Sequence, residues 1–294
     1  MRKKMSQFRR ILLAVISRAL FMAHGAVLVW RVVVVKSNSL YWLLLIGLLL
    51  LSIEMVVTLK LTKKGEWKWF SPMVFLYLSS TIPSVFLLEL ELLETRILIS
   101  NSTMDQDTLE QETNFSTYSK WAQVLEQIMV LVLVVGRWLA PKGEMNRDQL
   151  TQLLLLYIGL GADILDMLNM IKTPEVGTNW HVAIVGLCLF SCALIQFTLV
   201  LTQSSDLPET NNEQDTQTPV NGSRRSCCAS EIWSLLSGLC QQDGPFLVFR
   251  LYLSIGKLVI DELMIFFICK NALTVIIEIY RIIIIHVRHR RQNT

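Results

Sequence analysis

The chain has 294 residues, of which 52% are hydrophobic and only 17% are charged, and its mean hydropathy is +0.46. Because soluble domains carry roughly a quarter charged residues, this composition excludes an ordinary soluble domain and indicates a membrane protein. The net charge of +3 is small and the basic clusters flank apolar segments, so we expect no nucleic-acid partner.

Apolar segments recur along the whole chain, and a helix needs roughly 20 mostly apolar residues to cross a bilayer. The expected spans lie at about 11–35, 39–59, 70–93, 121–140, 150–171 and 181–201, and the apolar block 245–287 holds most of two more. The sequence therefore predicts an all-α, polytopic membrane helical bundle with about eight transmembrane helices, in a single multi-pass domain over 1–294.

The first apolar segment follows basic residues, so a cleaved signal peptide is the alternative to a first spanning helix. Arg18 interrupts the apolar run, and the apolar character continues to Val35 without a polar cleavage region. We therefore expect an uncleaved helix.

The distribution of basic residues predicts the orientation. With eight spans, the N-terminus, the second and fourth connections and the basic tail 286–294 lie on one side, and these segments hold the basic clusters. Such clusters mark the cytosolic side of membrane proteins. We therefore expect both termini and a flexible polar loop over 203–230 in the cytosol, in a protein of the plasma membrane or the secretory pathway.

The third connection, 94–120, carries N-glycosylation sequons at Asn101 and Asn114. The predicted orientation places this connection outside the cell or in the lumen. Because residues 97–120 are polar with little to bury, they are expected to form a flexible glycosylated loop. A third sequon, at Asn221, lies in the predicted cytosolic loop and is interpreted as a chance match.

None of the six cysteines lies in the predicted external loop, so the sequence indicates no external disulfide framework. Cys188 and Cys192 are one helical turn apart and are expected to pack against a neighbouring helix. Cys227 and Cys228 follow two arginines on the predicted cytosolic side, a juxtamembrane position typical of S-palmitoylation.

Ionisable residues within the spans are the candidate functional residues. A charge inside a bilayer is costly and is expected to face the bundle interior and to pair. The candidates are Glu54, Glu89, Asp163, Asp166, Asp243, Arg250, Lys257, Asp261, Lys270, Glu278 and Arg281.

Helical spacing gathers some of these candidates into rows. One row on the fifth span holds Gln152, Gly159, Asp163, Asp166 and Met170, with the glycine for close approach. A second row holds Lys270, Thr274, Glu278 and Arg281, in which Glu278 can pair with Arg281. The rows could line a polar cavity or an ion path, or they could pair to hold the helices in register. We favour the pairing interpretation.

The stretch 241–253, QQDGPFLVFRLYL, leaves the start of the seventh span open. In the favoured interpretation a helix starts here, with Asp243 as N-cap and Pro245 in the first turn. Its polar row is then Arg250, Ser254, Lys257 and Asp261, and Lys257 can pair with Asp261. In the alternative, one helix over about 232–254 is broken at Gly244-Pro245 and the chain turns at Gly256. Residues 231–242 also have the spacing of an amphipathic interfacial helix.

No motif indicates catalysis, a metal or a cofactor. The stretch from Gly159 to Asp163 approaches the Gly-x-Gly-Asp of intramembrane aspartyl proteases, but it has one residue too many and no Tyr-Asp pair accompanies it. The histidines offer no metal-binding spacing and no mid-span catalytic base; they are His24, His181, His286 and His289.

The sequence therefore predicts a non-enzymatic protein in a receptor-like or scaffold role. It would act through helix packing within the lipid bilayer and by binding other membrane proteins or a second copy. The alternative is an ion or small-solute transporter or channel that uses the polar rows.

Several long segments carry a resemblance to a known family. They are Lys68 to Pro72 with FLYL at 75–78, GRWLAPKGEMNRDQLTQLLL at 136–155, GADILD at 161–166, QDGPFLVFRLYL at 242–253 and FFICKNALTVIIEIYR at 266–281. From about residue 18 to 287, outside the two polar connections, the chain resembles the transmembrane protein 26 family. The resemblance implies eight spans, a glycosylated connection after the third span and a longer polar cytosolic tail than this chain has. It supplies no functional residues.

Overall fold

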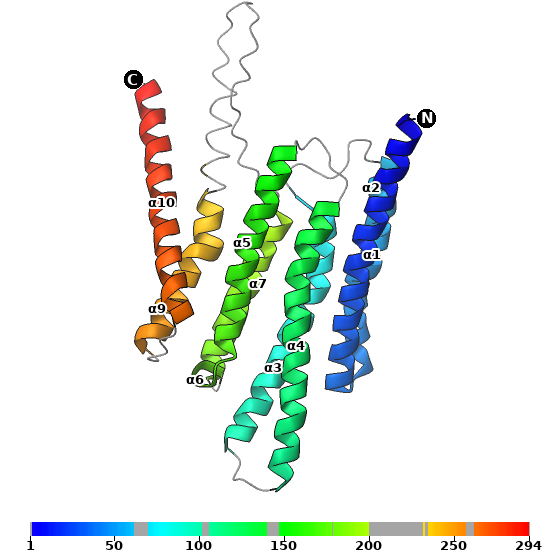
Figure 1. Cartoon of the computed structure of the whole chain (residues 1–294), viewed down its shortest axis with the longest axis vertical. Coiled ribbons are helices and arrows are strands. Elements are labelled where there is room, and N and C mark those ends of the chain that lie inside the picture. The colour runs from blue at the N-terminus through cyan, green and yellow to red at the C-terminus, as the bar shows by residue number, and fades with distance from the viewer. Residues whose placement is uncertain are drawn as a thin grey trace, which may run out of the picture. The chain divides into compact units, whose positions relative to one another are not determined.

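The computed structural model describes residues 2–61, 70–101, 106–139, 147–177, 179–199, 232, 235–256 and 262–293 (Figure 1). The chain divides into two compact units, Met1–Val200 and Leu201–Thr294, and each unit is described by itself.

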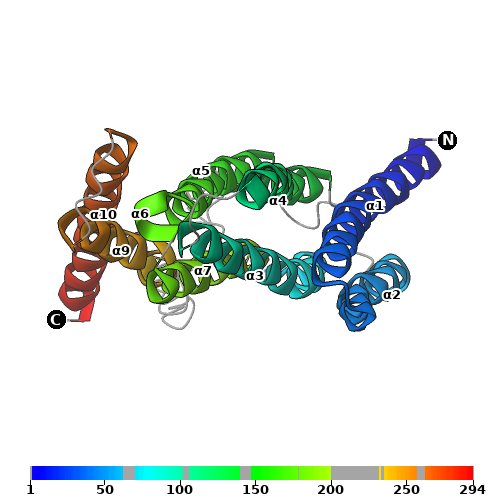
Figure 2. The same cartoon turned by 90° about the horizontal axis from the view of Figure 1, so that it is seen from below.

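The first unit consists of helices that run up and down side by side. They are α1 (Arg2–Lys36), α2 (Leu45–Leu61), α3 (Pro72–Asn101), α4 (Gln106–Leu139), α5 (Arg147–Ile171) and α7 (Trp180–Ile195), with the short α6 (Pro174–Gly177) and the 3₁₀ turns η1 (Ser39–Leu44) and η2 (Gln196–Thr198). Seen along the helices, α4 and α5 lie on one side and α3 and α7 on the other (Figure 2). α1 contacts α2, α3 and α4, and α7 contacts α3 and α5.

Seven described helices are long and apolar enough to cross a membrane. Their apolar spans are Ile11–Lys36, Ser39–Thr58, Pro72–Ser100, Phe115–Leu139, Leu150–Ile171, Trp180–Thr198 and Glu262–Arg288. In the part of the chain that the structure describes, no strand forms beyond an isolated bridge between Phe70 and Leu199. The prediction of an all-α polytopic bundle is confirmed, and the first six predicted spans each correspond to one of these helices.

Glycines set the distances between α4 and its neighbours in the core of the first unit. Phe21 on α1 is fully buried, and a Cβ at Gly136 on α4 would lie only 2.4 Å from its ring. A Cβ at Gly161 on α5 would lie 2.4 Å from Val130 on α4. In both places the absent side chain makes room for an apolar neighbour, so the helices pack closely without a void.

The prediction of a flexible loop over 97–120 is wrong for the residues that the structure describes. α3 continues to Asn101 and α4 begins at Gln106, so both sequon asparagines belong to helical backbone. A polar segment can be helical when it extends an existing helix, because propagation costs much less than nucleation. The guanidinium of Arg31 also lies 5.1 Å from the ring centroid of Tyr118, which ties this part of α4 to α1. Glycosylation at Asn101 and Asn114, and the side of the membrane on which they lie, stay predictions.

The second unit contains a helical segment over 235–256 and the helix α10 (Glu262–Asn293). Within the first segment, the π turn η3 (Leu239–Asp243) leads directly into α9 (Gly244–Gly256). α9 alone has 13 residues, but at about 1.5 Å per residue the whole segment is about 33 Å long. That length is close to the hydrocarbon thickness of about 30 Å. Of these two helical segments, α10 is the one that is both long and apolar enough to cross a membrane, so it corresponds to the eighth predicted span, and the seventh stays a prediction.

The π turn reconciles Pro245 with a continuous helix. Proline has no N–H, and its ring crowds the carbonyl four residues earlier, so an α-helix cannot pass through it unchanged. Here the Gly244 N–H donates to the carbonyl of Leu239, five residues earlier, which widens the turn at the proline. A Cβ at Gly244 would lie 2.6 Å from that carbonyl oxygen, so the close approach requires glycine.

The favoured interpretation of 241–253 is therefore wrong. Asp243 lies inside helical backbone and is not an N-cap. The predicted interfacial helix over 231–242 is instead, from 235 on, the first part of the longer segment. α9 is described up to Gly256, so the structure does not reach the remaining members of the row, Lys257 and Asp261. These two residues lie outside the described residues.

Candidate functional site

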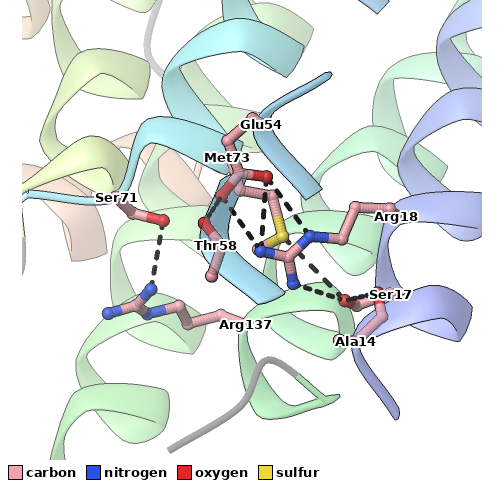
Figure 3. A network of polar contacts seen from close by, with 8 residues as sticks. All are labelled: Ala14, Ser17, Arg18, Glu54, Thr58, Ser71, Met73 and Arg137. Atoms are coloured by element: carbon pink, nitrogen blue, oxygen red, sulfur yellow. Dashed lines mark hydrogen bonds and ion pairs between the residues drawn. The ribbon is translucent and has the colours of Figure 1, made fainter. Parts of the chain in front are cut away.

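An ion pair between α1 and α2 is hydrogen-bonded on both of its partners (Figure 3). The Arg18 guanidinium donates to Glu54 from Nη2 to Oε1 at 3.2 Å and from Nε to Oε2 at 3.4 Å. The Thr58 hydroxyl donates to the same carboxylate at 2.6 Å, and Ser17 Oγ accepts from Arg18 Nη1 at 3.3 Å. The side chains of Arg18 and Glu54 are only 1% and 9% exposed. Glu54, a predicted candidate, is thus neutralised by a partner on another helix.

A second polar link in Figure 3 lies at the same end of the first unit. Arg137, on the last turn of α4, donates to Ser71 Oγ at 3.1 Å. The Ser71 backbone N–H donates to the Thr198 carbonyl at 2.8 Å, beside the bridge between Phe70 and Leu199. These bonds connect α4, the start of α3 and the end of η2.

His24 lies in the middle of the first span, Ile11–Lys36. Its Nε2 lies 3.0 Å from the Leu125 carbonyl oxygen, which can only accept, so Nε2 carries the proton. Its Nδ1 can then accept from the Tyr77 hydroxyl at 2.7 Å. A neutral imidazole satisfies both contacts and joins α1, α3 and α4, which indicates a structural role.

A buried ion cluster joins α3, α4 and the residue that follows α5. Lys172 Nζ forms an ion pair with Glu126 and lies 3.2 Å from Glu89 Oε1. Arg96 Nη2 lies 4.0 Å from Glu89 Oε2. None of the four side chains is more than 12% exposed, and the two cations balance the two carboxylates. Burial acts to lower the pKa of Lys172, but the Glu126 and Glu89 carboxylates outweigh burial and raise it.

A cavity of about 440 Å³ lies between the end of α1, the second half of α3 and the first half of α4. Its polar lining consists of Arg31, Ser37, Glu91, Thr95 and Tyr118, and the rest of its lining is apolar. Glu91 is ion-paired with Lys36. Arg31 contacts the Tyr118 ring and, within the described part of the chain, forms no ion pair or hydrogen bond.

The predicted row on α5 is only partly buried. Asp163 is buried and Asp166 half-buried, but Gln152 is exposed. A Cβ at Gly159 would meet nothing within 4 Å, so the prediction of close approach at this glycine is wrong. The close approach occurs at Gly161 instead, because that residue faces α4.

In the second unit Arg250 is fully buried among aromatic rings. Its guanidinium lies 4.8 Å from the Phe267 centroid and 5.7 Å from the Phe246 centroid. On α10 the predicted row lies on a half-buried face that comprises Lys270, Thr274, Glu278 and Arg281. Asn271, beside that row, is fully buried, and Asp243 is half-buried. Cys227 and Cys228 lie outside the described residues, and their palmitoylation stays a prediction.

Several buried polar residues are not among the predicted candidates. Glu126 is the one acidic residue in the apolar span 121–140. The free-energy cost of burying a charged side chain in the bilayer is the signal that could identify it from the sequence. Lys172 and Arg96 belong to connections by sequence, and only packing shows that they reach Glu89. Among the residues described, no group of three His, Cys, Asp or Glu side chains could hold a metal ion.

Apolar helices linked by buried ion pairs define a polytopic helical membrane protein. The chain belongs to the transmembrane protein 26 family, because the sequence model of that family matches residues 8–281. The resemblance that the sequence segments indicate is therefore confirmed. No solved structure matches the chain.

Proposed function

We propose that this protein is a non-enzymatic membrane protein with a receptor-like or scaffold role, which acts through helix packing and partner binding. The observation that supports this role is the pairing of buried charges across helices in the first unit. Arg18 is matched by Glu54, and Lys172 is matched by Glu89 and Glu126. Such pairs hold helices in register, whereas ion conduction requires polar groups that face water.

Broad apolar faces supply the surface for partners. In the apolar stretch of the span that contains α2, only 11% of the residues are buried inside the structure, and the fraction is the same for α10. Faces of this kind contact lipid, and they also accept helices of another membrane protein or of a second copy through close van der Waals packing.

A transporter or channel is the second candidate, and one observation favours it. In the cluster around Lys172, three buried atoms have no hydrogen-bond partner: Glu89 Oε1, Glu126 Oε1 and Arg96 Nη2. Glu89 Oε1 lies 3.2 Å from the Lys172 amine, in an ion pair. Buried polar atoms of this kind can be satisfied by a water molecule or a transported ion.

Ion and solute flux separates the two candidates. The full chain is reconstituted into liposomes that contain pH- and cation-sensitive dyes, beside the variant Glu126→Gln and the exposed control Glu94→Gln on α3. The proposed role predicts that flux into liposomes with the wild type or either variant does not exceed the flux into empty liposomes. Flux that the wild type and Glu94→Gln share and that Glu126→Gln abolishes would establish the transporter instead.

Photo-crosslinking in intact membranes tests partner binding directly. A photoreactive side chain replaces Ile53 on α2, which is 60% exposed, or the neighbouring Leu51, which is 0% exposed and serves as the control. We expect a discrete protein adduct from position 53 that is absent from position 51. Lipid adducts alone at position 53 would contradict partner binding through α2.

A further inference from the structure

The cavity between α1, α3 and α4 presents a cation without an anionic partner in the described part of the chain. Arg31 belongs to the first span, Ile11–Lys36, where an unneutralised charge is costly. Its guanidinium lies over the face of the Tyr118 ring, 5.1 Å from the ring centroid. A cation–π contact leaves the N–H groups of the guanidinium available for an oxygen acceptor.

The remaining polar groups of the cavity favour an anion over a cation. The Glu91 carboxylate of the lining is already paired with Lys36, whereas the Arg31 guanidinium forms no ion pair with a described residue. The hydroxyls of Thr95 and Ser37 donate to backbone carbonyls of their own segments, at 2.9 and 3.4 Å. Among the described residues that line the cavity, Arg31 is therefore the charged donor that is available to a ligand.

The rest of the cavity is suited to an apolar chain. Val34 on α1 and Leu92, Leu98 and Ile99 on α3 line it. Leu98 is 70% exposed, so its side chain has apolar surface to cover. A volume of about 440 Å³ lies within the range of small-ligand sites, about 300–1,000 Å³.

We propose that this cavity binds an amphipathic organic anion, whose charged group contacts Arg31 and whose apolar chain packs against Val34, Leu92 and Leu98. This inference deepens the receptor-like role and rests on it. The ligand class is defined by an acidic head, carboxylate or phosphate, and one aliphatic chain. Both soluble fatty acids and the anionic lipids of the membrane have this chemistry.

Binding of a soluble probe to the delipidated full chain in neutral detergent tests the site. The probe is dodecanoate, and dodecanol is its uncharged match. We expect saturable binding of dodecanoate and at least tenfold weaker binding of dodecanol. Arg31→Met should weaken dodecanoate binding by about tenfold or more, because a charge-assisted contact is lost. Ala122→Phe fills the lining from α4 while Arg31 is retained, and it should weaken both probes.

Lys120→Met is the matched control, because Lys120 is an exposed cation on the same part of α4 and does not line the cavity. It should leave the dissociation constant of dodecanoate unchanged. Each variant is compared only after its elution volume and thermal unfolding midpoint match those of the wild type. Should Ala122→Phe misfold, Thr95→Leu provides the steric test.

Nanodiscs distinguish the two sources of ligand. If anionic phospholipid in the nanodisc suppresses dodecanoate binding relative to neutral phospholipid, the site takes its ligand from the membrane; equal binding indicates a soluble ligand. Either result supports the site. Equal affinity for dodecanoate and dodecanol, or an Arg31→Met variant that binds like the wild type, overturns it. If either of these results occurs while the liposomes show only background flux, this site is excluded and the receptor-like role stands. Flux that depends on Glu126 overturns the receptor-like role itself.

Discussion

Removing one charge of the pair between Arg18 and Glu54 is expected to destabilise the protein strongly, whereas removing both is not. Glu54→Gln leaves a guanidinium that is only 1% exposed without a counter-charge. Breaking a buried ion pair from one side costs about 3–5 kcal/mol, because the remaining charge stays desolvated. Arg18→Met leaves the Glu54 carboxylate in the same position. The double variant R18M/E54Q contains no buried charge here and should be more stable than either single variant.

The size of the coupling free energy between positions 18 and 54 distinguishes a charge pair from an ordinary hydrogen bond between membrane helices. Interhelical hydrogen bonds in a membrane protein contribute about 0.6 kcal/mol on average. A coupling free energy above about 2 kcal/mol between positions 18 and 54 would therefore require the charges. The Thr58 hydroxyl lies 2.6 Å from the carboxylate of Glu54. In the Glu54→Gln variant it can still donate to the oxygen of the new side-chain amide, so the loss would not reflect that bond.

Equilibrium unfolding of the full chain in lipid–detergent micelles, followed by tryptophan fluorescence, measures the four free energies of this cycle. Glu94→Gln, an exposed change on α3, is the control and should lie within about 0.5 kcal/mol of the wild type. Single variants within about 0.5 kcal/mol of the wild type, with additive effects in the double variant, would refute the reasoning.

Three further predictions concern helix packing, the π turn and the orientation. Gly136→Ala should lower the free energy of unfolding by about 1–3 kcal/mol, because the new methyl group would lie 2.4 Å from the buried Phe21 ring. The control Gly159→Ala, whose methyl group would meet nothing within 4 Å, should be neutral or stabilise α5 by up to about 1 kcal/mol. Equal losses of stability at both sites would contradict close packing at Gly136. Gly244→Ala should lower the thermal unfolding midpoint, because its Cβ would lie 2.6 Å from the Leu239 carbonyl oxygen; an unchanged midpoint would exclude this close approach. If the connection between α3 and α4 faces the lumen, Asn101→Gln and Asn114→Gln should each remove one glycosidase-sensitive step in gel mobility; wild-type protein without such steps would refute this glycosylation.

The sequence predicts the first six spans well because each is a long apolar segment whose length matches the bilayer. It predicts the segment around 97–120 badly, because a polar composition reports what a segment cannot bury and not whether it extends a helix. At 241–253 local rules for Asp and Pro favour a helix start, and the structure instead accommodates the proline with a π turn. That outcome depends on the close approach of Gly244 to Leu239, which no local preference predicts.

By itself the sequence determined that the protein is a helical membrane protein and that Glu54 and Glu89 need partners, because desolvation of a charge is a local cost. Only the tertiary structure decided which partners they have. Arg18 is 36 residues from Glu54. Lys172 is 46 residues from Glu126, which shares it with Glu89. Ionic pairing depends on which helix faces meet, and those faces are set by the packing of glycines and apolar side chains along several helices at once.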